Sequence, residues 1–219
     1  MASIPIPREL QPGNDFTWQA IGVCERLTSA VLLAGVSPIL GASAVTVSLL
    51  SGRSPFIAHK RVGWRGKTLW MLKLRTMWGG ENTGPRRGNR WVEYIEDNGP
   101  SQKQGPDPRV RGWFANFCRR HSIDELPQLW HVITGDMALV GPRPITPAEL
   151  RQHYGAGAEA ILDVKPGIAG LWQVSGRSRL SYAERRNLDV AFVRQRSLRM
   201  YFKILLRTIP EVLNGTNTW

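Results

Sequence analysis

Cysteine is scarce in this sequence: Cys24 and Cys118 are the only thiols in a chain of 219 residues. Two isolated cysteines do not make the framework of a disulfide-stabilised secreted domain, and they do not have the spacing of a metal site. Both are therefore interpreted as packing residues of a protein in a reducing compartment.

Acidic residues are few in relation to basic ones. Lysine and arginine together number 29, aspartate and glutamate 17, and the formal net charge is +12. A hydrophobic content of 42% indicates a folded chain and not a disordered one. A folded protein this basic favours an anionic partner, and charge alone does not choose among nucleic acid, a membrane surface and phosphorylated small molecules.

Charged residues are absent altogether from Leu27 to Gly52. A helix of that length would run about 39 Å, which exceeds the hydrocarbon core of a bilayer, about 30 Å thick. Ser37-Pro38 lies near the middle of the run, and proline bends or breaks a helix. The serine hydroxyl can bind a carbonyl that the proline leaves without a donor. The residues alone leave open a re-entrant segment, a kinked spanning helix and a buried core helix.

This apolar segment divides the chain into three parts. Residues 1–19 lack the basic-then-apolar order of a secretory signal, so they are predicted to be a flexible lead-in. Residues 20–52 are the predicted membrane segment, broken at Ser37-Pro38, and residues 53–219 are the predicted catalytic domain. Lys60 and Arg61 follow the segment closely, which favours a cytoplasmic location for that domain.

Two strands are predicted next, at 55–60 and 68–76, joined into a hairpin by the turn at 62–66. Period two places Lys73 and Arg75 on one face, where they form either a solvated edge or a pair of donors for phosphates. Residues 79–104 are rich in glycine, proline, asparagine and charge. They are predicted to be a long surface loop with a short helix at 91–96.

Helical patterns return in the second half of the chain, at 113–120, 124–133 and 146–154. The tail from Tyr182 to Leu213 intersperses apolar residues with arginine and lysine, and a break is predicted near Ser197. An amphipathic basic helix suits an anionic bilayer, although a surface helix packed on the domain has the same pattern. The predicted fold class is α+β: a helix-break-helix membrane segment, a small β-hairpin and a mostly helical domain with interfacial helices.

The adjacent acids Asp124 and Glu125 have two interpretations. Ser122 to Glu125 fits the S-x-x-E capping box, which would give the acids a structural role. A carboxylate at a helix start is also held ionised by the helix dipole, and an ionised aspartate can attack phosphorus while a neighbouring glutamate binds a divalent metal or takes a proton. Adjacent helical residues point about 100° apart, so the two acids would take different roles. Four arginines lie near them in the sequence and suit phosphate: Arg119, Arg120, Arg143 and Arg177.

A series of short motifs then occurs in a fixed order from about Glu25 to the C-terminus. The motifs are Ser37-Pro38, Lys-Leu-Arg-Thr-Met at 73–77, Asp-Pro-Arg-Val at 107–110, Asp-Glu-Leu-Pro-Gln-Leu-Trp at 124–130, Gly-Asp-Met at 135–137, Val-Gly-Pro-Arg-Pro at 140–144, Lys-Pro-Gly-Ile-Ala-Gly at 165–170 and Gln-Val-Ser-Gly-Arg at 173–177. In this combination the chain closely resembles the bacterial sugar transferases, which are monotopic polyprenyl-phosphate phosphoglycosyl transferases. One departure is Tyr201-Phe202-Lys203, where the family often has Asp-Leu-Lys.

The resemblance implies a two-step reaction. Asp124 matches the nucleophile that attacks the β-phosphate of a UDP-sugar and releases UMP. Polyprenyl (undecaprenyl) phosphate then takes the phosphosugar from the aspartyl intermediate. Glu125 matches the acid that binds Mg²⁺, with Mn²⁺ as an alternative, and helps to deprotonate the acceptor.

The resemblance also implies the remaining site residues and the location. Lys73, Arg119, Arg143 and Arg177 match positions that line the phosphate and nucleotide site, and Arg75, Pro144 and Gln173 belong to the same motifs. The Ser-Pro break implies a re-entrant helix with both ends in the cytoplasm, in the bacterial inner membrane. The form Gly170-Leu171-Trp172-Gln173 resembles members that serve exopolysaccharide or capsule assembly and often transfer glucose- or galactose-1-phosphate. The sequence leaves open a homodimer.

Two other classes of function compete with this one. The charge of +12 and nine tryptophans suit a membrane-tethered nucleic-acid binder, but such a protein has no need of an Asp-Glu pair, and we expect no nucleic-acid partner. A carbohydrate hydrolase also uses two carboxylates, but adjacent acids do not readily flank a glycosidic bond at the required separation.

Overall fold

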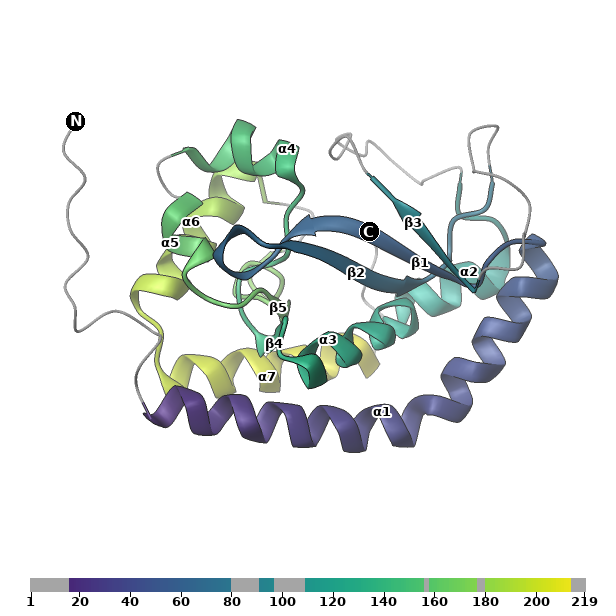
Figure 1. Cartoon of the computed structure of the whole chain (residues 1–219), viewed down its shortest axis with the longest axis horizontal. Helices are drawn as coiled ribbons and strands as arrows, with labels where there is room; N and C mark the ends of the chain where they lie inside the picture. Colours follow the sequence, from purple (N-terminus) through teal and green to yellow (C-terminus); the bar gives the residue numbers. More distant parts are fainter. Residues whose placement is uncertain (1–15, 80–90, 97–108, 156–157, 177–179, 214–219) are drawn as a thin grey trace.

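The structure is a computed structural model that describes residues 16–79, 91–96, 109–155, 158–176 and 180–213. It contains one long helix, two small sheets and a set of shorter helices (Figure 1). The predicted α+β class, with a long apolar N-terminal helix and a mostly helical remainder, is confirmed. Most of the predicted loop at 79–104 lies outside the described residues.

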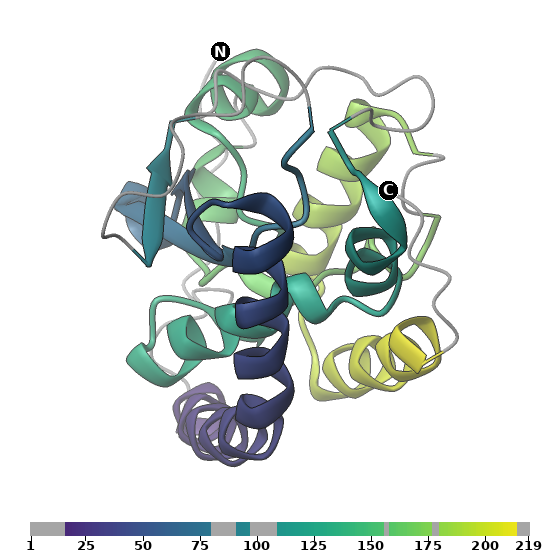
Figure 2. The same ribbon diagram turned by 90° about the vertical axis from the view of Figure 1, so that its right-hand side faces the viewer.

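The long helix α1 spans Phe16–Ser51, so it begins inside the segment predicted to be a flexible lead-in. It ends before Gly52, which takes a left-handed φ of 63°. The predicted break at Ser37-Pro38 is wrong in one respect, because the helix is continuous through Pro38 and bends near its middle (Figures 1 and 2). Pro38 has no N–H to donate to the carbonyl of Ala34, and the Ser37 hydroxyl donates to that carbonyl instead, at 2.8 Å. As predicted, the Ser37 hydroxyl binds the carbonyl that Pro38 leaves without a donor. The helix bends in the region where a break was expected.

The predicted hairpin is confirmed. Strand β1, Phe56–Val62, pairs antiparallel with β2, Thr68–Leu74, in a register that runs from Phe56 opposite Leu74 to Val62 opposite Thr68. The one-turn 3₁₀ helix η2, Trp64–Gly66, makes the connection. Within η2, Arg65 and Gly66 take left-handed φ values of 55° and 74°.

The short helix predicted at 91–96 is wrong, because Val92–Ile95 forms strand β3 and pairs parallel with β1. The strand order in this sheet is β2-β1-β3. The backbone N–H of Phe56 donates to the carbonyl of Trp91. The guanidinium of Arg75, the residue after β2, contacts the carboxylate of Glu93. These partners lie far away in the sequence, so tertiary pairing overrides the local pattern here.

A second, two-stranded sheet joins β4, Ala138–Val140, to β5, Gly167–Ala169, in parallel. Beyond these strands the backbones of Gly141 and Gly167 come into close contact. A Cβ added at Gly167 would lie 2.0 Å from the nitrogen of Gly141. Only glycine fits at this point, and the turn at 165–167 is thereby held against the loop that carries Arg143.

The helices of the second half follow the predicted order. They are α2 at Gly112–Arg120, the 3₁₀ helix η3 at Ile123–Gln128, α3 at Leu129–Thr134, α4 at Pro147–Glu149, the π-helical turn η4 at Leu150–Tyr154, α5 at Ala158–Leu162, α6 at Tyr182–Arg194 and α7 at Leu198–Leu213. The gap between α6 and α7 confirms the break predicted near Ser197. Thr146 caps α4 in a full capping box with Glu149.

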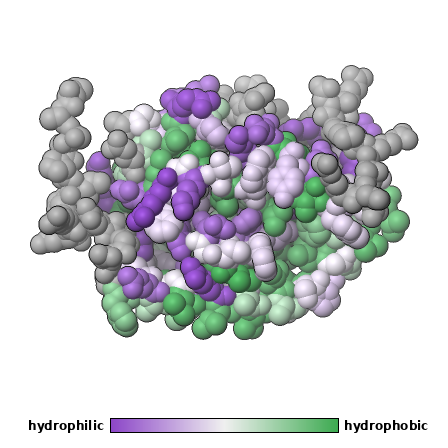
Figure 3. Space-filling view, in the orientation of Figure 1, coloured by the Kyte–Doolittle hydropathy of each residue, from purple (hydrophilic) through white to green (hydrophobic). Residues whose placement is uncertain are grey.

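Helix α1 packs against the domain along one face and leaves its other face exposed. Trp18 and Ile21 join an apolar cluster with Phe192 and Ile204, whereas Ala44 and Val47 join another with Leu74 and Cys118. Leu27 and Val31, between these anchoring points, are 65% and 73% exposed. The apolar residues form the lower edge of the surface in Figure 3, where α1 lies in Figure 1. By length and composition, α1 is the one helix among the described residues that could cross a membrane.

Candidate active site

The acids Asp124 and Glu125 lie in η3, and the residue before this helix has an unusual backbone. Ser122 takes a left-handed conformation, φ 55° and ψ 22°, which a residue other than glycine rarely adopts. Its side chain makes no capping hydrogen bond to η3, and the N–H of Glu125 donates to the Ser122 carbonyl instead, at 3.0 Å. The predicted capping box is therefore wrong, and it does not account for the two acids.

The two carboxyl groups are in different electrostatic environments. Burial raises the pKa of Asp124 to about 6, although Lys73 acts in the opposite direction, and the charge of Glu125 adds to the rise. Burial acts in the same direction on Glu125, but Lys73 and Arg143 outweigh it and lower its pKa to about 2. The helix start was predicted to hold Asp124 ionised; its backbone hydrogen bond does lower the pKa, but burial outweighs that effect. Burial makes Asp124 a stronger base than an exposed aspartate, and nearby cations limit that effect.

Three predicted cations surround the acids, each from a different element. Lys73 on β2 places its ammonium nitrogen 2.7 Å from Oε1 of Glu125, and both side chains are largely buried. Arg119 on α2 lies 3.5 Å from the hydroxyl of Thr76, and its charge acts on both acids. Arg143 acts on Glu125 from the loop after β4. The structure therefore brings together three of the cationic positions, while Arg120 is exposed and Arg177 lies outside the described residues.

Arg75 is placed differently from the prediction. Its guanidinium is 3% exposed, contacts Glu93 on β3 and donates to the carbonyl of Ser54 at 2.8 Å. The predicted shared face with Lys73 does not make it a partner of the acids, because its partners lie at the edge formed by β3. These contacts hold the sheet together, and the role of Arg75 toward phosphate stays a prediction.

The loop that carries Arg143 is held by a residue that sequence analysis missed. Asp189 on α6 is fully buried and accepts hydrogen bonds from the Tyr154 hydroxyl, at 2.9 Å, and from the backbone N–H of Arg143. Burial raises the pKa of Asp189 to about 7. No local signal marks this aspartate, since it sits among arginines on a helix that reads as charged and solvated. Pro144, beside Arg143, is buried as well.

A second missed contact joins α1 to the domain. Glu25 is 7% exposed and accepts hydrogen bonds from the Tyr201 hydroxyl on α7 and from the N–H of Leu139 on β4, each at 2.8 Å. Tyr201 is the residue that departs from the Asp-Leu-Lys pattern that the resemblance led us to expect. In this chain the Tyr201 hydroxyl donates to the Glu25 carboxylate, whereas an aspartate at this position would repel that carboxylate. The departure seen in the sequence is thus a packed contact between α1 and α7.

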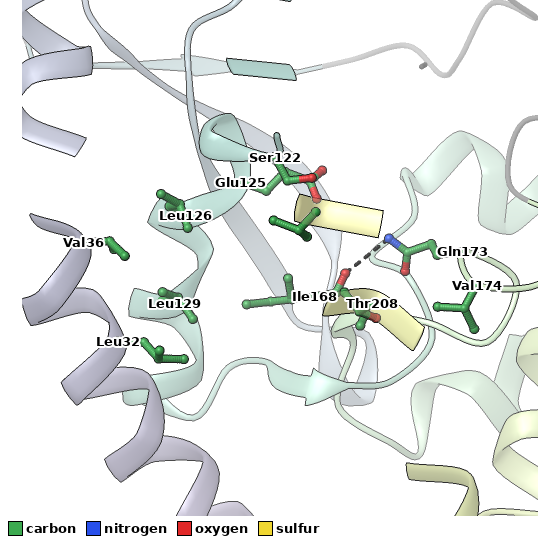
Figure 4. A pocket seen from close by; sticks show the side chains of 12 residues that line it. Leu32, Val36, Ser122, Glu125, Leu126, Leu129, Ile168, Gln173, Val174 and Thr208 are labelled. Carbon is green, nitrogen blue, oxygen red and sulfur yellow. Dashed lines mark hydrogen bonds between the residues drawn. The ribbon is translucent and has the colours of Figure 1, made fainter. Parts of the chain in front are cut away.

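A cavity of about 280 Å³ adjoins Glu125 and Gln173 (Figure 4). Gln173 lies in the turn after β5, is 8% exposed and donates to the carbonyl of Ile168 at 3.2 Å. The predicted site residues Glu125 and Gln173 are therefore brought to one cavity from segments far apart in the sequence.

The described residues contain no cluster of three or more histidine, cysteine, aspartate or glutamate side chains. Magnesium does not need one, because it is commonly held by one or two carboxylates together with substrate phosphates and water. Glu125 offers one such carboxylate: Lys73 is bound to its Oε1, so Oε2 is the oxygen that would hold the metal. The donor set therefore fits Mg²⁺ that is completed by a phosphorylated substrate.

Comparison with known proteins agrees with this chemistry. The profile of the family described as bacterial sugar transferase matches residues 18–215. The chain is 37% identical over 194 residues to the exopolysaccharide production protein ExoY of Sinorhizobium fredii, an alignment that covers 85% of this chain and 82% of the relative. It is 33% identical to the UDP-glucose:undecaprenyl-phosphate glucose-1-phosphate transferase of Caulobacter vibrioides, covering 96% of this chain and 77% of that one. Identity to the undecaprenyl-phosphate galactose phosphotransferase of Salmonella typhimurium is 36%, over 74% of this chain and 34% of the longer relative.

Proposed function

The chain belongs to the bacterial sugar transferase family, a family of sugar phosphotransferases, and from this premise we propose that it transfers a sugar-1-phosphate from a UDP-sugar to polyprenyl phosphate for exopolysaccharide or capsule synthesis. The observation that carries the proposal is the setting of Asp124: a buried carboxylate beside Glu125, with Lys73, Arg119 and Arg143 around the pair. Phosphoryl transfer depends mainly on positioning and on neutralising phosphate charge, and this arrangement supplies both.

In the first step an oxygen of Asp124 attacks the β-phosphorus of the UDP-sugar. The bond from that phosphorus to the bridging oxygen breaks, UMP leaves, and the sugar phosphate is joined to Asp124 as an acyl phosphate. Burial favours this attack, because a carboxylate with a raised pKa is more nucleophilic than an exposed one. Lys73 and Arg119 offset the charge of the donor phosphates.

In the second step a phosphate oxygen of polyprenyl phosphate attacks the same phosphorus. The acyl phosphate bond breaks, Asp124 is regenerated, and the product is a polyprenyl diphosphosugar. Glu125 would hold Mg²⁺, which supplies further charge neutralisation when bound. Lys73, 2.7 Å away, keeps Glu125 ionised for this task, and the lowered pKa suits a metal ligand better than a base.

The same proposal places the enzyme in the bacterial inner membrane with the catalytic domain in the cytoplasm. The bend of α1 supports a segment that returns to the side from which it entered. Helix α7 runs along the same lower side of the molecule as the first half of α1 (Figures 1 and 2). It exposes an apolar stripe that includes Phe202, Leu206 and Ile209, as a helix lying on a bilayer does.

The test uses the full chain in lipid vesicles. We expect continuous release of UMP from a UDP-sugar only when polyprenyl phosphate and Mg²⁺ are present. When the lipid is omitted, we expect at most one UMP per enzyme, together with exchange of labelled UMP into the UDP-sugar. Exchange is the signature of a covalent intermediate, since it requires reversal of the first step alone. Transfer without exchange would exclude the intermediate, and unchanged transfer in a chelator would exclude the metal. A panel of UDP-sugars, beginning with glucose and galactose, identifies the sugar.

A further inference from the structure

The cavity beside Glu125 is lined mainly by apolar side chains of segments far apart in the chain, together with the polar residues Ser122, Gln173 and Thr208. Val36 and Leu32 come from α1, Leu129 from α3, Ile168 from β5 and Val212 from α7. Figure 4 shows Leu32 and Val36 on α1 at one side of the cavity, with Leu129 of α3 beside them. Glu125 and Gln173 lie at the part of the cavity farther from α1. The space therefore separates the anchor helix from the reaction centre.

The two ends of the cavity differ in character. At one end lies Glu125, whose carboxylate is paired with Lys73 and is acted on by Arg143. At the other end lies Leu32, which lines the cavity and is also 46% exposed on the apolar outer face of α1. An apolar passage thus leads from the outer face of α1 to a cluster of cations and acids.

This combination selects the kind of molecule that fits. A nucleotide or sugar would lose its hydration against aliphatic walls with few partners for its polar groups, which is costly. A hydrocarbon chain that ends in a phosphate matches both ends, with the chain against the leucines and valines and the phosphate near Lys73 and Arg143. The volume of 280 Å³ holds only part of a long chain, roughly two five-carbon units at about 30 Å³ per heavy-atom group.

We propose that this cavity binds the isoprene units next to the phosphate of the polyprenyl acceptor, an inference that rests on the proposed function. Seating these units fixes the acceptor phosphate at Glu125, beside the phosphosugar on Asp124, so the second step proceeds between two held groups. Val36, two residues before Pro38 in α1, lines this cavity.

The first test fills the cavity and compares it with the lipid-facing side of the same helix. Val36→Trp places a large ring in the cavity, whereas Val31→Trp, the matched control, places it where the native valine is 73% exposed. We expect Val36→Trp to raise the KM for polyprenyl phosphate at least tenfold while lipid-free UMP exchange stays within twofold of wild type. Val31→Trp should change neither. An unchanged KM in Val36→Trp would overturn the proposal, whereas absence of exchange in the wild-type enzyme would overturn the proposed function instead.

The second test does not depend on a variant that folds. A polyprenyl phosphate with a photoreactive group on its first or second isoprene unit should label wild-type peptides that contain Val36 or Val212, and unlabelled polyprenyl phosphate should compete. The comparison arm is a phosphatidylglycerol with the same group on an acyl chain. If the phospholipid labels these peptides and excess polyprenyl phosphate does not displace it, the cavity holds ordinary membrane lipid and the proposal fails.

Discussion

In α1 most of the buried side chains are polar, whereas the largest buried side chains in the rest of the domain are apolar. Four polar residues of α1, Glu25, Ser29, Ser43 and Ser48, are buried, whereas several of its leucines and valines face outward. The domain follows the opposite rule, with core residues that include Leu74, Met137 and Ile204. An outward apolar face is stable only in apolar surroundings, so the outer face of α1 suits lipid while the rest of the domain suits water. Each prediction below tests that division or the site where the two parts meet.

The largest effect should come from replacing Asp124, the proposed nucleophile. Asp124→Asn keeps the size of the side chain but removes the nucleophile, so we expect UMP exchange and transfer to fall at least about 10³-fold. The protein should remain folded and membrane-bound, because the variant removes a buried charge without leaving a cavity. Exchange at the wild-type rate would contradict the assignment of Asp124.

This difference between α1 and the rest of the domain is tested by placing one lysine on each. Val31→Lys on the outer face of α1 should weaken membrane insertion by about 2–3 kcal/mol, measured as the fraction of protein that floats with vesicles. Ala183→Lys, at an exposed position on α6, should have no measurable effect. Equal tolerance of both lysines would mean that the outer face of α1 meets water.

The buried setting of Asp124 predicts a pH dependence of the first step. The folded pKa is raised to about 6, so the nucleophilic carboxylate form is present above that pH and is lost as the pH falls through it. Between pH 7 and pH 5 we expect the rate of UMP exchange to drop by roughly tenfold. A profile that is flat down to pH 4.5 would show that burial does not control this group.

The smallest effect concerns the hydrogen bond that joins Tyr201 of α7 to Glu25 of α1. Tyr201→Phe removes the hydroxyl that binds Glu25 and should destabilise the protein by about 1 kcal/mol, seen as a thermal midpoint lower by roughly 2–4 °C in micelles. The neighbouring Phe202, which is 55% exposed on α7, gives the control: Phe202→Leu should shift the midpoint little. Identical midpoints for wild type and Tyr201→Phe would show that the joint adds nothing to stability.

Features with a local physical cause were predictable. The helix of α1, the hairpin of β1 and β2, and the gap near Ser197 follow from uncharged runs, period-two patterns and turn residues. The link from Ser37 to the carbonyl opposite Pro38 is equally local. For the site, the motifs predicted Lys73, Arg119 and Arg143 near the acids, and the structure brings them there.

Features that depend on distant partners were not predictable. Val92–Ile95 is a strand because β1 is beside it, and Arg75 is taken by Glu93 of that strand. Asp189 holds the Arg143 loop across more than forty residues of sequence. Ser122 has the sequence of a capping box, yet its backbone conformation places its side chain outside that role.

Asp124 and Glu125 show which properties follow from the sequence and which follow from the tertiary structure. The sequence by itself determined that an acidic pair stands at the start of a helical segment, within a basic domain that follows an uncharged anchor. Only the tertiary structure decided how the two acids differ, because burial and the approach of Lys73 from β2 are properties of packing. It also decided that the cavity beside them is lined by α1, since only folding brings Val36 of the anchor to the acid that starts the second half of the chain.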